Sequence, residues 1–247
     1  MAHSMLSPYL NLGLLHPAEV AETAEKAYRA GKVPLQSAEG FIRQIIGWRE
    51  YVWGVYWLWM PEYASGNALG AYRDLPPLFT RGETAMRCLA ESLTAVREHG
   101  YAHHIQRLMV LGNFMLLCEF DPDEVYRWFM ELFIDSYDWV MVPNVMGMGL
   151  WADGGRMASK PYVSGGAYID RMSDYCGDCR YDPRRRTGDQ ACPFTTLYWD
   201  FLIRHHRRFK TNRRMAMVLK NVERLDSKQK HAIRDRAGEV RILGTRH

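Results

Sequence analysis

Apolar residues recur at helical spacing along most of this chain, and no segment shows the regular two-residue alternation of a half-buried strand. The clearest example is the segment 37–59, whose apolar residues follow at intervals of three or four positions: Phe41, Ile45, Trp48 and Val52. This spacing places them on one buried face of a helix, with Ser37 as the expected N-cap and Pro61 as the end. We therefore expect an all-α fold.

Further helices are expected from the same periodicity and from end signals, over residues 16–31, 83–100, 103–120, 121–142 and 194–209. The second ends at Gly100, and the fourth opens with Asp121 as N-cap and Pro122 at the first helical position. The segment 103–120 is apolar almost all round, which indicates a central helix. Residues 143–170 are rich in Gly, Met and Pro, and we expect an irregular loop there that surrounds a functional site.

The positive charge of the chain is concentrated near its C-terminal end. Residues 204–247 contain fourteen Lys or Arg and four Asp or Glu, whereas the whole chain of 247 residues carries a net charge of only +4. Such a basic segment is typical of a solvated helix or of a protein that contacts phosphate backbones. We expect residues 1–215 to form the main helical domain and residues 216–247 a basic helical extension, in a monomeric protein.

The sequence shows neither a run of eighteen apolar residues nor a secretory signal pattern. We therefore expect a cytoplasmic protein that does not span a membrane. Five cysteines in a chain of this length favour thiols or metal ligands over a disulfide framework.

Three of the five cysteines, Cys176, Cys179 and Cys192, cluster in a short arginine-rich segment. Two thiolates in a C-x-x-C arrangement can bind one metal from a single turn, and a tetrahedral sulfur site needs a fourth ligand. Cys88, on an amphipathic helix, is the better candidate for it, because Cys118 lies in an apolar run and is more simply a core residue. Ligand type alone leaves both zinc and an iron–sulfur cluster open.

Six stretches of the sequence together resemble the photolyase/cryptochrome superfamily: residues 4–20, 41–57, 100–114, 135–155, 159–182 and 191–205. The most specific features are the motif HHIQRLM at residues 103–109 and the C-x-x-C motif with a further cysteine after twelve residues. The similarity is greatest to the bacterial iron–sulfur branch, the deoxyribodipyrimidine photolyase-related proteins, which includes (6-4) photolyases, and it extends from Ser4 to about Met215. The resemblance implies an all-helical FAD-binding catalytic domain with a 4Fe-4S cluster. Family members begin with an α/β antenna domain, and we expect that domain to be absent because no strand–helix alternation occurs here.

The resemblance also implies roles for individual residues. The ligands of the cluster would be Cys88, Cys176, Cys179 and Cys192. The residues expected at the FAD phosphates are Ser4, Leu6 and Ser7. Those expected around the flavin ring are Gln44, Trp48, Arg49, Arg107, Asp135, Asp138 and Asn144.

His103 and His104 resemble the histidine pair of (6-4) photolyases, which implies proton donation to the lesion by a side chain whose pKa lies near neutrality. Trp128 resembles the tryptophan next to the flavin on its electron-supply route. Two departures affect that route, because Thr80 stands where the family usually has tryptophan and Phe129 where it often has tyrosine. The aromatic residues that offer another route are Tyr162, Tyr168, Trp139 and Trp151.

The implied function is light-driven repair of UV-damaged DNA, with the (6-4) photoproduct as the expected lesion, by electron transfer from reduced FAD. The partner would be DNA with a flipped-out lesion. Phosphate contacts are expected from Arg204, Arg207, Arg208, Lys210, Arg213 and Arg214. Two alternatives remain open: a cryptochrome-like blue-light sensor and a non-enzymatic iron–sulfur module that binds nucleic acid.

Overall fold

The computed structural model describes residues 4–243, and residues 1–3 and 244–247 lie outside the described part. Helices dominate it, and its only β-type pairings are two isolated bridges, Arg73 with Phe120 and Asp182 with Ala191. The expected all-α fold is confirmed. No helix within residues 4–243 is both long and apolar enough to cross a membrane.

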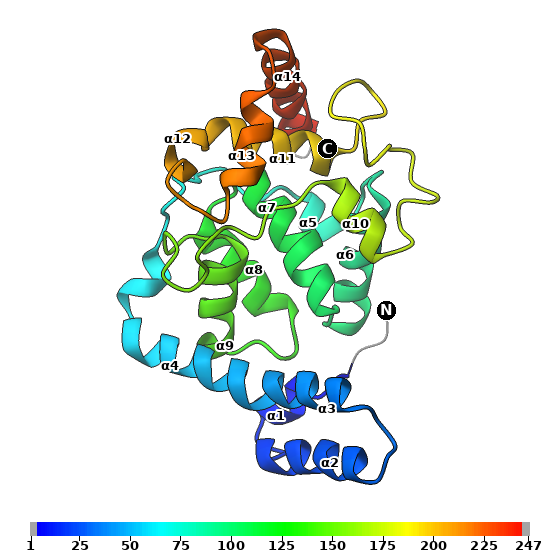
Figure 1. Ribbon diagram of the computed structural model, residues 1–247, viewed down its shortest axis with the longest axis vertical. Helices are drawn as coiled ribbons and strands as arrows, with labels where there is room; N and C mark the ends of the chain where they lie inside the picture. Colours follow the sequence, from blue (N-terminus) through cyan, green and yellow to red (C-terminus); the bar gives the residue numbers. More distant parts are fainter. Residues whose placement is uncertain (1–3, 244–247) are drawn as a thin grey trace.

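The N-terminal helices form one end of the molecule (Figure 1), and some of their residues line a pocket. They are α1 (Ser7–Asn11), α2 (Pro17–Arg29), α3 (Leu35–Ile42), the π-helical segment η1 (Arg43–Trp48) and α4 (Arg49–Trp59). The last three follow one another without a break, so they form the long helix expected before Pro61. Ser37 is not its N-cap, because the helix begins at Leu35 after an extended Pro34.

The middle of the chain supplies the core. Its helices are η2 (Glu62–Ser65), α5 (Leu78–Arg81), α6 (Arg87–His99), η3 (Gln106–Gly112), α7 (Asn113–Leu117), α8 (Pro122–Leu132), α9 (Asp138–Val142) and η4 (Pro143–Gly149). The α8 helix begins as predicted, since the Asp121 side chain accepts a hydrogen bond from the backbone N–H of Asp123 (2.9 Å). Helix α6 ends at Gly100, whose φ of +58° is a left-handed conformation that glycine adopts easily.

The C-terminal helices pack over the core at the other end. They are α10 (Gly166–Met172), α11 (Pro193–Arg204), α12 (His206–Phe209), α13 (Ala216–Glu223) and α14 (Ser227–Leu243). The loop expected over residues 143–170 was predicted too long, because η4 and α10 occupy both of its ends. Buried side chains of α13 and α14, including Leu219 and Ala237, belong to the same core as the rest. The boundary between residues 215 and 216 stays a prediction.

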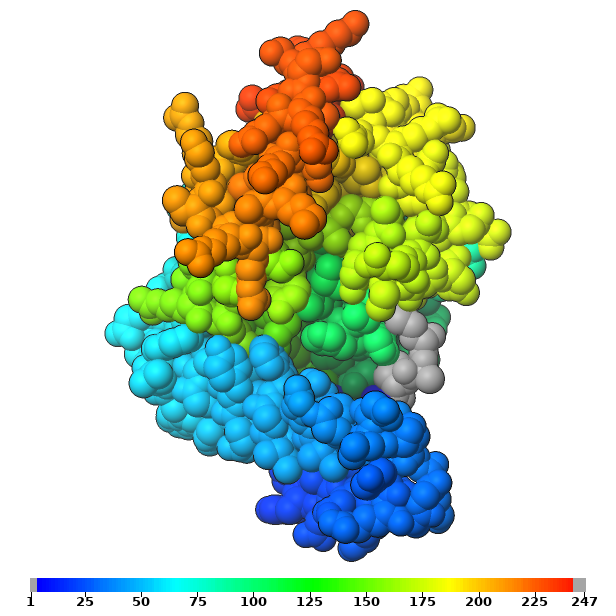
Figure 2. Space-filling model, in the orientation of Figure 1, coloured from blue at the N-terminus to red at the C-terminus, as the bar shows by residue number. Residues whose placement is uncertain are grey.

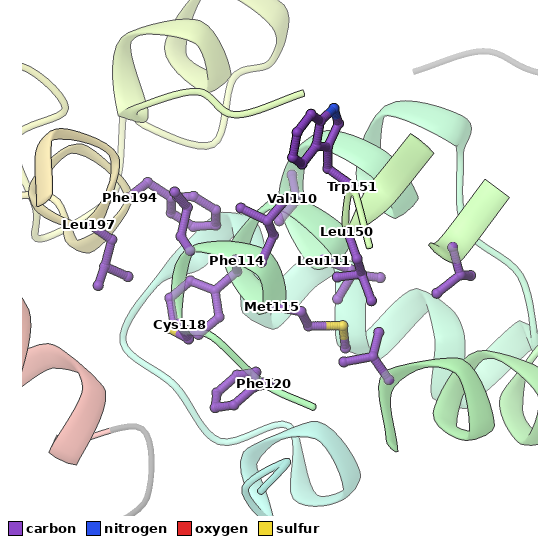
Figure 3. Packing of buried hydrophobic residues seen from close by; sticks show 14 of the residues in the cluster. Val110, Leu111, Phe114, Met115, Cys118, Phe120, Leu150, Trp151, Phe194 and Leu197 are labelled. Atoms are coloured by element: carbon purple, nitrogen blue, oxygen red, sulfur yellow. The ribbon is translucent and has the colours of Figure 1, made fainter. Parts of the chain in front are cut away.

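Aromatic residues fill the centre of this core (Figure 3). Phe114 on α7 is 1% exposed, and its ring centroid lies 5.3 Å from that of Phe194 and 6.3 Å from that of Phe79. Leu197 of α11 is fully buried nearby. The apolar segment 103–120 is therefore central, as its composition predicts.

A buried ion network fixes the C-terminal helix to the body of the protein. Asp200 on α11 is 1% exposed and accepts hydrogen bonds from Arg204 Nε (2.7 Å) and from Arg241 of α14. Both arginines also form ion pairs with Glu119. Two cations and two carboxylates thus neutralise each other where water is largely excluded.

Candidate functional site

A deep pocket lies between the N-terminal helical wall and the central helices. Its empty space is about 1200 Å³, part of which is open to solvent. The polar side chains that line it are Ser7, Asn11, Gln44, Arg49, His104, Arg107, Asp135 and Asn144. The aromatic ones are Trp48, Tyr101, Phe129 and Trp139, and most of the remaining lining is aliphatic. An apolar cavity with a few convergent polar groups is the usual form of a cofactor or small-molecule site.

All three π-helical segments found within residues 4–243 contribute to this pocket. Gln44, Ile45 and Trp48 come from η1, Arg107, Leu108 and Gly112 from η3, and Asn144, Val145, Met148 and Gly149 from η4. A π-helical turn holds an extra residue, and such turns occur frequently at functional sites. The sequence offers no direct signal for them, since each reads as an ordinary helix or as a loop.

Asp135 is the polar centre of the pocket. One carboxylate oxygen accepts a hydrogen bond from Arg107 Nη1 (2.9 Å) and the other accepts one from Ser7 Oγ (2.6 Å). Asn11 donates its side-chain amide to the backbone carbonyl of Asp135 (2.8 Å) and accepts from Arg49 Nη1 (2.9 Å). These contacts fix the start of the described chain against the central helices. Asn11 was not predicted, because nothing near it in sequence distinguishes it from a surface asparagine.

Arg107 is held firmly but keeps one unused donor. Its Nε donates to the carbonyl of Ala102 (2.7 Å), and its guanidinium lies 4.4 Å from the ring centroids of both Tyr101 and Phe133. Its Nη2 is buried without a hydrogen-bond partner among residues 4–243. An unsatisfied buried donor is costly, and an acceptor on a ligand in this pocket would satisfy it. The site thus fits a ligand with carbonyl or phosphate oxygens.

Two further contacts shape the wall around Arg49. Trp48 Nε1 donates to the Asn144 side-chain oxygen (3.3 Å), and the Asn144 amide donates to the Val140 carbonyl (2.7 Å). The Arg49 guanidinium lies 4.6 Å from the ring centroid of Trp139. Burial lowers the pKa of Arg49, and the neighbouring Glu50 opposes that shift.

The two predicted histidines have different surroundings. His104 lines the pocket, whereas His103 does not, and the Nδ1 of His103 accepts a hydrogen bond from the backbone N–H of Ile105 (3.1 Å). His104 lies at the exposed edge of the pocket, yet the protein atoms crowded around its ring lower its pKa by disfavouring the charged form. Arg107 and His103 lower the pKa further by charge repulsion. His104 is therefore mainly neutral at pH 7.

Several predicted flavin-contacting residues lie outside the lining. Ser4 and Leu6 are close by in sequence but do not line the pocket, although the Ser4 carbonyl accepts a hydrogen bond from Tyr101 (3.3 Å). Asp138 is exposed and accepts a hydrogen bond from Tyr126. Trp128 is buried behind Phe129, with ring centroids 5.0 Å apart, and donates to the carbonyl of Phe79 (3.1 Å).

A second, smaller cavity is lined by four of the five cysteines: Cys88, Cys176, Cys179 and Cys192. It encloses about 310 Å³, including space open to solvent. Cys118 lies elsewhere, fully within the core. The structure thus brings Cys88 of α6 to the same cavity as the three clustered cysteines. A Cβ atom added at Gly166 would lie 2.7 Å from the sulfur of Cys192, so the backbone approaches this thiol closely.

The four thiols do not form a site for a single ion. Among residues 4–243, no group of three or more His, Cys, Asp or Glu side chains is placed to hold one metal ion. Tetrahedral zinc with bonds of about 2.3 Å would need sulfur atoms in near contact with one another. Burial raises the pKa of Cys176 to about 12 and that of Cys192 to about 11, and it raises that of Cys88 well above its usual value. Without a metal, the thiols of Cys88, Cys176 and Cys192 are therefore protonated at pH 7, so that metal binding would have to displace protons.

The predicted phosphate-contacting residues lie at the C-terminal end. Arg204 is only 17% exposed, and its guanidinium is already paired with Asp200 and Glu119. The other five are exposed: Arg207, Arg208, Lys210, Arg213 and Arg214. Figure 1 places α12 and α13 toward the opposite end of the long axis from α1–α3. These cations are thus well separated from the N-terminal wall of the large pocket.

Comparison with known proteins gives two relatives. No family model matches the chain. It is 51% identical over 235 residues to a (6-4) photolyase of Agrobacterium fabrum, covering 95% of this chain and 46% of that protein. It is also 41% identical over 102 residues to an uncharacterised protein of Acanthamoeba polyphaga mimivirus, covering 41% of this chain and 76% of that one. The chain thus spans about half the length of the photolyase that it matches.

The fold and the large pocket together define an all-helical protein with a cavity of the kind that cofactors or small molecules occupy. Its all-α architecture agrees with the helical C-terminal part of photolyases, and the matched region accounts for nearly the whole chain. The chain belongs to the photolyase/cryptochrome superfamily.

Proposed function

We propose that this chain is the FAD-binding catalytic domain of a DNA photolyase that repairs (6-4) photoproducts in blue light. The observation that carries the proposal is the large pocket, which collects seven of the ten residues expected to contact FAD: Ser7, Gln44, Trp48, Arg49, Arg107, Asp135 and Asn144. The 51% identity to a (6-4) photolyase over 95% of the chain supports it.

The residues of the pocket are suited to hold FAD. Reduced FAD, when bound, would supply the light-driven electron for the reaction. Arg107 Nη2 is a buried donor without a partner in the described chain, and Asp135 fixes the orientation of that guanidinium. Aliphatic residues such as Ile45, Val52 and Leu108 would exclude water from the ring system.

His104 is the histidine of the pair that we propose to act on the lesion, since it lines the pocket at its exposed edge. The negative charge of bound DNA would raise its pKa again and favour the protonated form that donates a proton. His103 would act as a positioning residue, because its ring accepts the backbone N–H of Ile105 and so fixes the start of this helix.

Electrons would reach the pocket through Trp139, Trp53 and Trp57. Trp139 lines the pocket, its ring centroid lies 5.3 Å from that of Trp53, and Trp53 lies 5.6 Å from Trp57. Trp57 is 65% exposed. After Trp57 has given an electron toward the flavin, a thiol in solution could therefore reduce its oxidised ring. This route would avoid Phe129, whose ring is hard to oxidise, and Thr80, which has no ring.

The four cysteines would hold a 4Fe-4S cluster. They line one cavity, although no three or more His, Cys, Asp or Glu side chains of residues 4–243 are placed to hold a single metal ion. Sulfur-only ligands suit iron–sulfur chemistry. The experiment is to measure iron and acid-labile sulfide in anaerobically purified protein. Iron that is lost in Cys88→Ser but kept in the matched variant Cys118→Ser would support the cluster, and protein that contains only zinc would contradict it.

DNA would be bound by the exposed cations of the C-terminal half, of which Arg207 and Arg208 lie on α12 and Lys210 follows that helix. Their contacts would be to phosphates and independent of sequence. Arg204 is left out of this proposal because its charge is neutralised in the buried network.

The decisive experiment is repair of a duplex that contains one (6-4) photoproduct, by FAD-loaded protein under blue light. We expect restored pyrimidines only in the light. His104→Ala should lower the repair rate by about 100-fold without loss of FAD, as for removal of a general acid. His103→Asn keeps an acceptor for the Ile105 N–H and should retain most activity. Light-driven flavin reduction without any loss of the lesion would contradict repair and favour the sensor.

A further inference from the structure

A basic groove lies between the end of α11, α12 and the last two helices. Figures 1 and 2 show these C-terminal helices at one end of the molecule. Its empty space is about 640 Å³, part of it open to solvent. Its lining is apolar at Ile203 and Val222 and charged at Arg204, His206, Arg207, Glu223 and Lys230. It shares no residue with the large pocket or with the cysteine cavity.

Some of the charged side chains in this groove are neutralised by ion pairs, and others are not. Arg204 is neutralised by Asp200 and Glu119. His206 Nε2 lies 3.2 Å from a carboxylate oxygen of Glu223, which is the only acidic residue of the lining. Arg207 is exposed, Lys230 is half-buried, and neither has a carboxylate partner within residues 4–243. Two unneutralised cations thus line the groove from two different elements, Arg207 from α12 and Lys230 from α14.

We propose that this groove binds a phosphate group between Arg207 and Lys230. A planar guanidinium binds phosphate oxygens through two parallel hydrogen bonds, and an ammonium adds a compact positive charge. A half-buried lysine keeps its ion pair better than one in bulk water, because the surrounding protein reduces screening. The phosphate can belong to a free ligand or to a nucleic-acid backbone, and both offer the same oxygen atoms.

The groove is independent of the flavin proposal. Its residues lie on α11–α14, whereas the large pocket is lined from α1, η1, α4, η3 and η4, among others, and the two sets share no helix. A phosphate held here would therefore add a second point of attachment rather than a part of the flavin site.

The test is calorimetric titration of the full chain with inorganic pyrophosphate and, separately, with an undamaged 12-base-pair DNA duplex. We expect Arg207→Gln and Lys230→Gln each to weaken binding by about tenfold, the effect of one charge-assisted hydrogen bond. The matched controls Arg224→Gln and Lys228→Gln remove exposed cations that do not line the groove, and they should change affinity less than twofold.

A variant that is expected to bind phosphate more tightly separates the loss of a contact from unfolding of the protein. Glu223→Gln removes the only acidic group of the lining and should tighten binding several-fold. Groove variants that weaken pyrophosphate binding identify a free-phosphate ligand, and variants that weaken only duplex binding identify a backbone. Equal losses in the groove and control variants, or no effect of Glu223→Gln on either ligand, would overturn the proposal.

Discussion

The ion pair between Arg107 and Asp135 can be tested without any cofactor. Its side chains are 18% and 7% exposed, and Asp135 also accepts a hydrogen bond from Ser7. Asp135→Ala leaves the guanidinium buried beside Tyr101 and Phe133 with no opposite charge. Breaking a buried pair in this way costs about 3–5 kcal/mol. For a chain of this size the melting temperature should fall by about 6–20 °C.

The assay is urea unfolding and thermal unfolding of the cofactor-free protein, both followed by circular dichroism. Asp138→Ala is the matched control, since this exposed carboxylate lies three residues away and accepts a single hydrogen bond from Tyr126. We expect it to cost less than about 1 kcal/mol. The double variant Asp135→Leu with Arg107→Met should recover most of the lost stability, because an apolar pair replaces both charges. Equal losses in Asp135→Ala and Asp138→Ala would refute the reasoning.

Three other predictions concern the core, a titrating histidine and the electron route. Phe114→Ala should lower the free energy of unfolding by about 3–5 kcal/mol in urea titrations, because a fully enclosed ring leaves a cavity. Burial, with nearby Arg204 and Arg208, lowers the pKa of His205 to about 4. The unfolded state binds more protons between pH 6.5 and 4, so stability is lost as the pH falls through that range. The free energy of unfolding should therefore be lower at pH 4.5 than at pH 7, and His205→Phe should remove about 2 kcal/mol of that difference, as measured by urea unfolding at both pH values. Trp53→Phe should slow photoreduction of bound flavin in transient absorption, and Trp59→Phe, which lies outside the pocket lining, should not.

Local signals in the sequence predicted the helices well. The segment 16–31 forms α2 at Pro17–Arg29, because proline favours the first turn and Gly31 adopts a left-handed φ of +70° just after the end. Ser37 was placed wrongly as a cap because the helix starts one turn earlier, after Pro34. The Gly- and Met-rich segment after Val142 was expected to be irregular, yet Pro143 opens the helical segment η4, since tertiary packing overrides weak propensity.

The candidate sites were predicted unevenly. The resemblance identified Gln44, Arg49 and Arg107, all of which line the pocket, but spacing could not separate Asp135 in the pocket from Asp138 outside it. Asp135 lies before the turn that leads into α9, and Asp138 is the first residue of α9. Tertiary contacts, which the local sequence does not encode, determine which of the two side chains faces the pocket. Local sequence also could not show that Arg204 is neutralised, because its partner Glu119 lies 85 positions away along the chain.

The wide turns of η1, η3 and η4 make the pocket sensitive to chain length as well as to residue type. Each ordinary helical residue advances the side-chain direction by about 100°. Deleting one residue within Arg43–Trp48 would restore a regular pitch and remove the extra residue that this wide turn holds, while the side chains before and after it would keep about their present directions. Relatives that differ by a single insertion at one of these turns would therefore present a different inner surface while keeping the same helices.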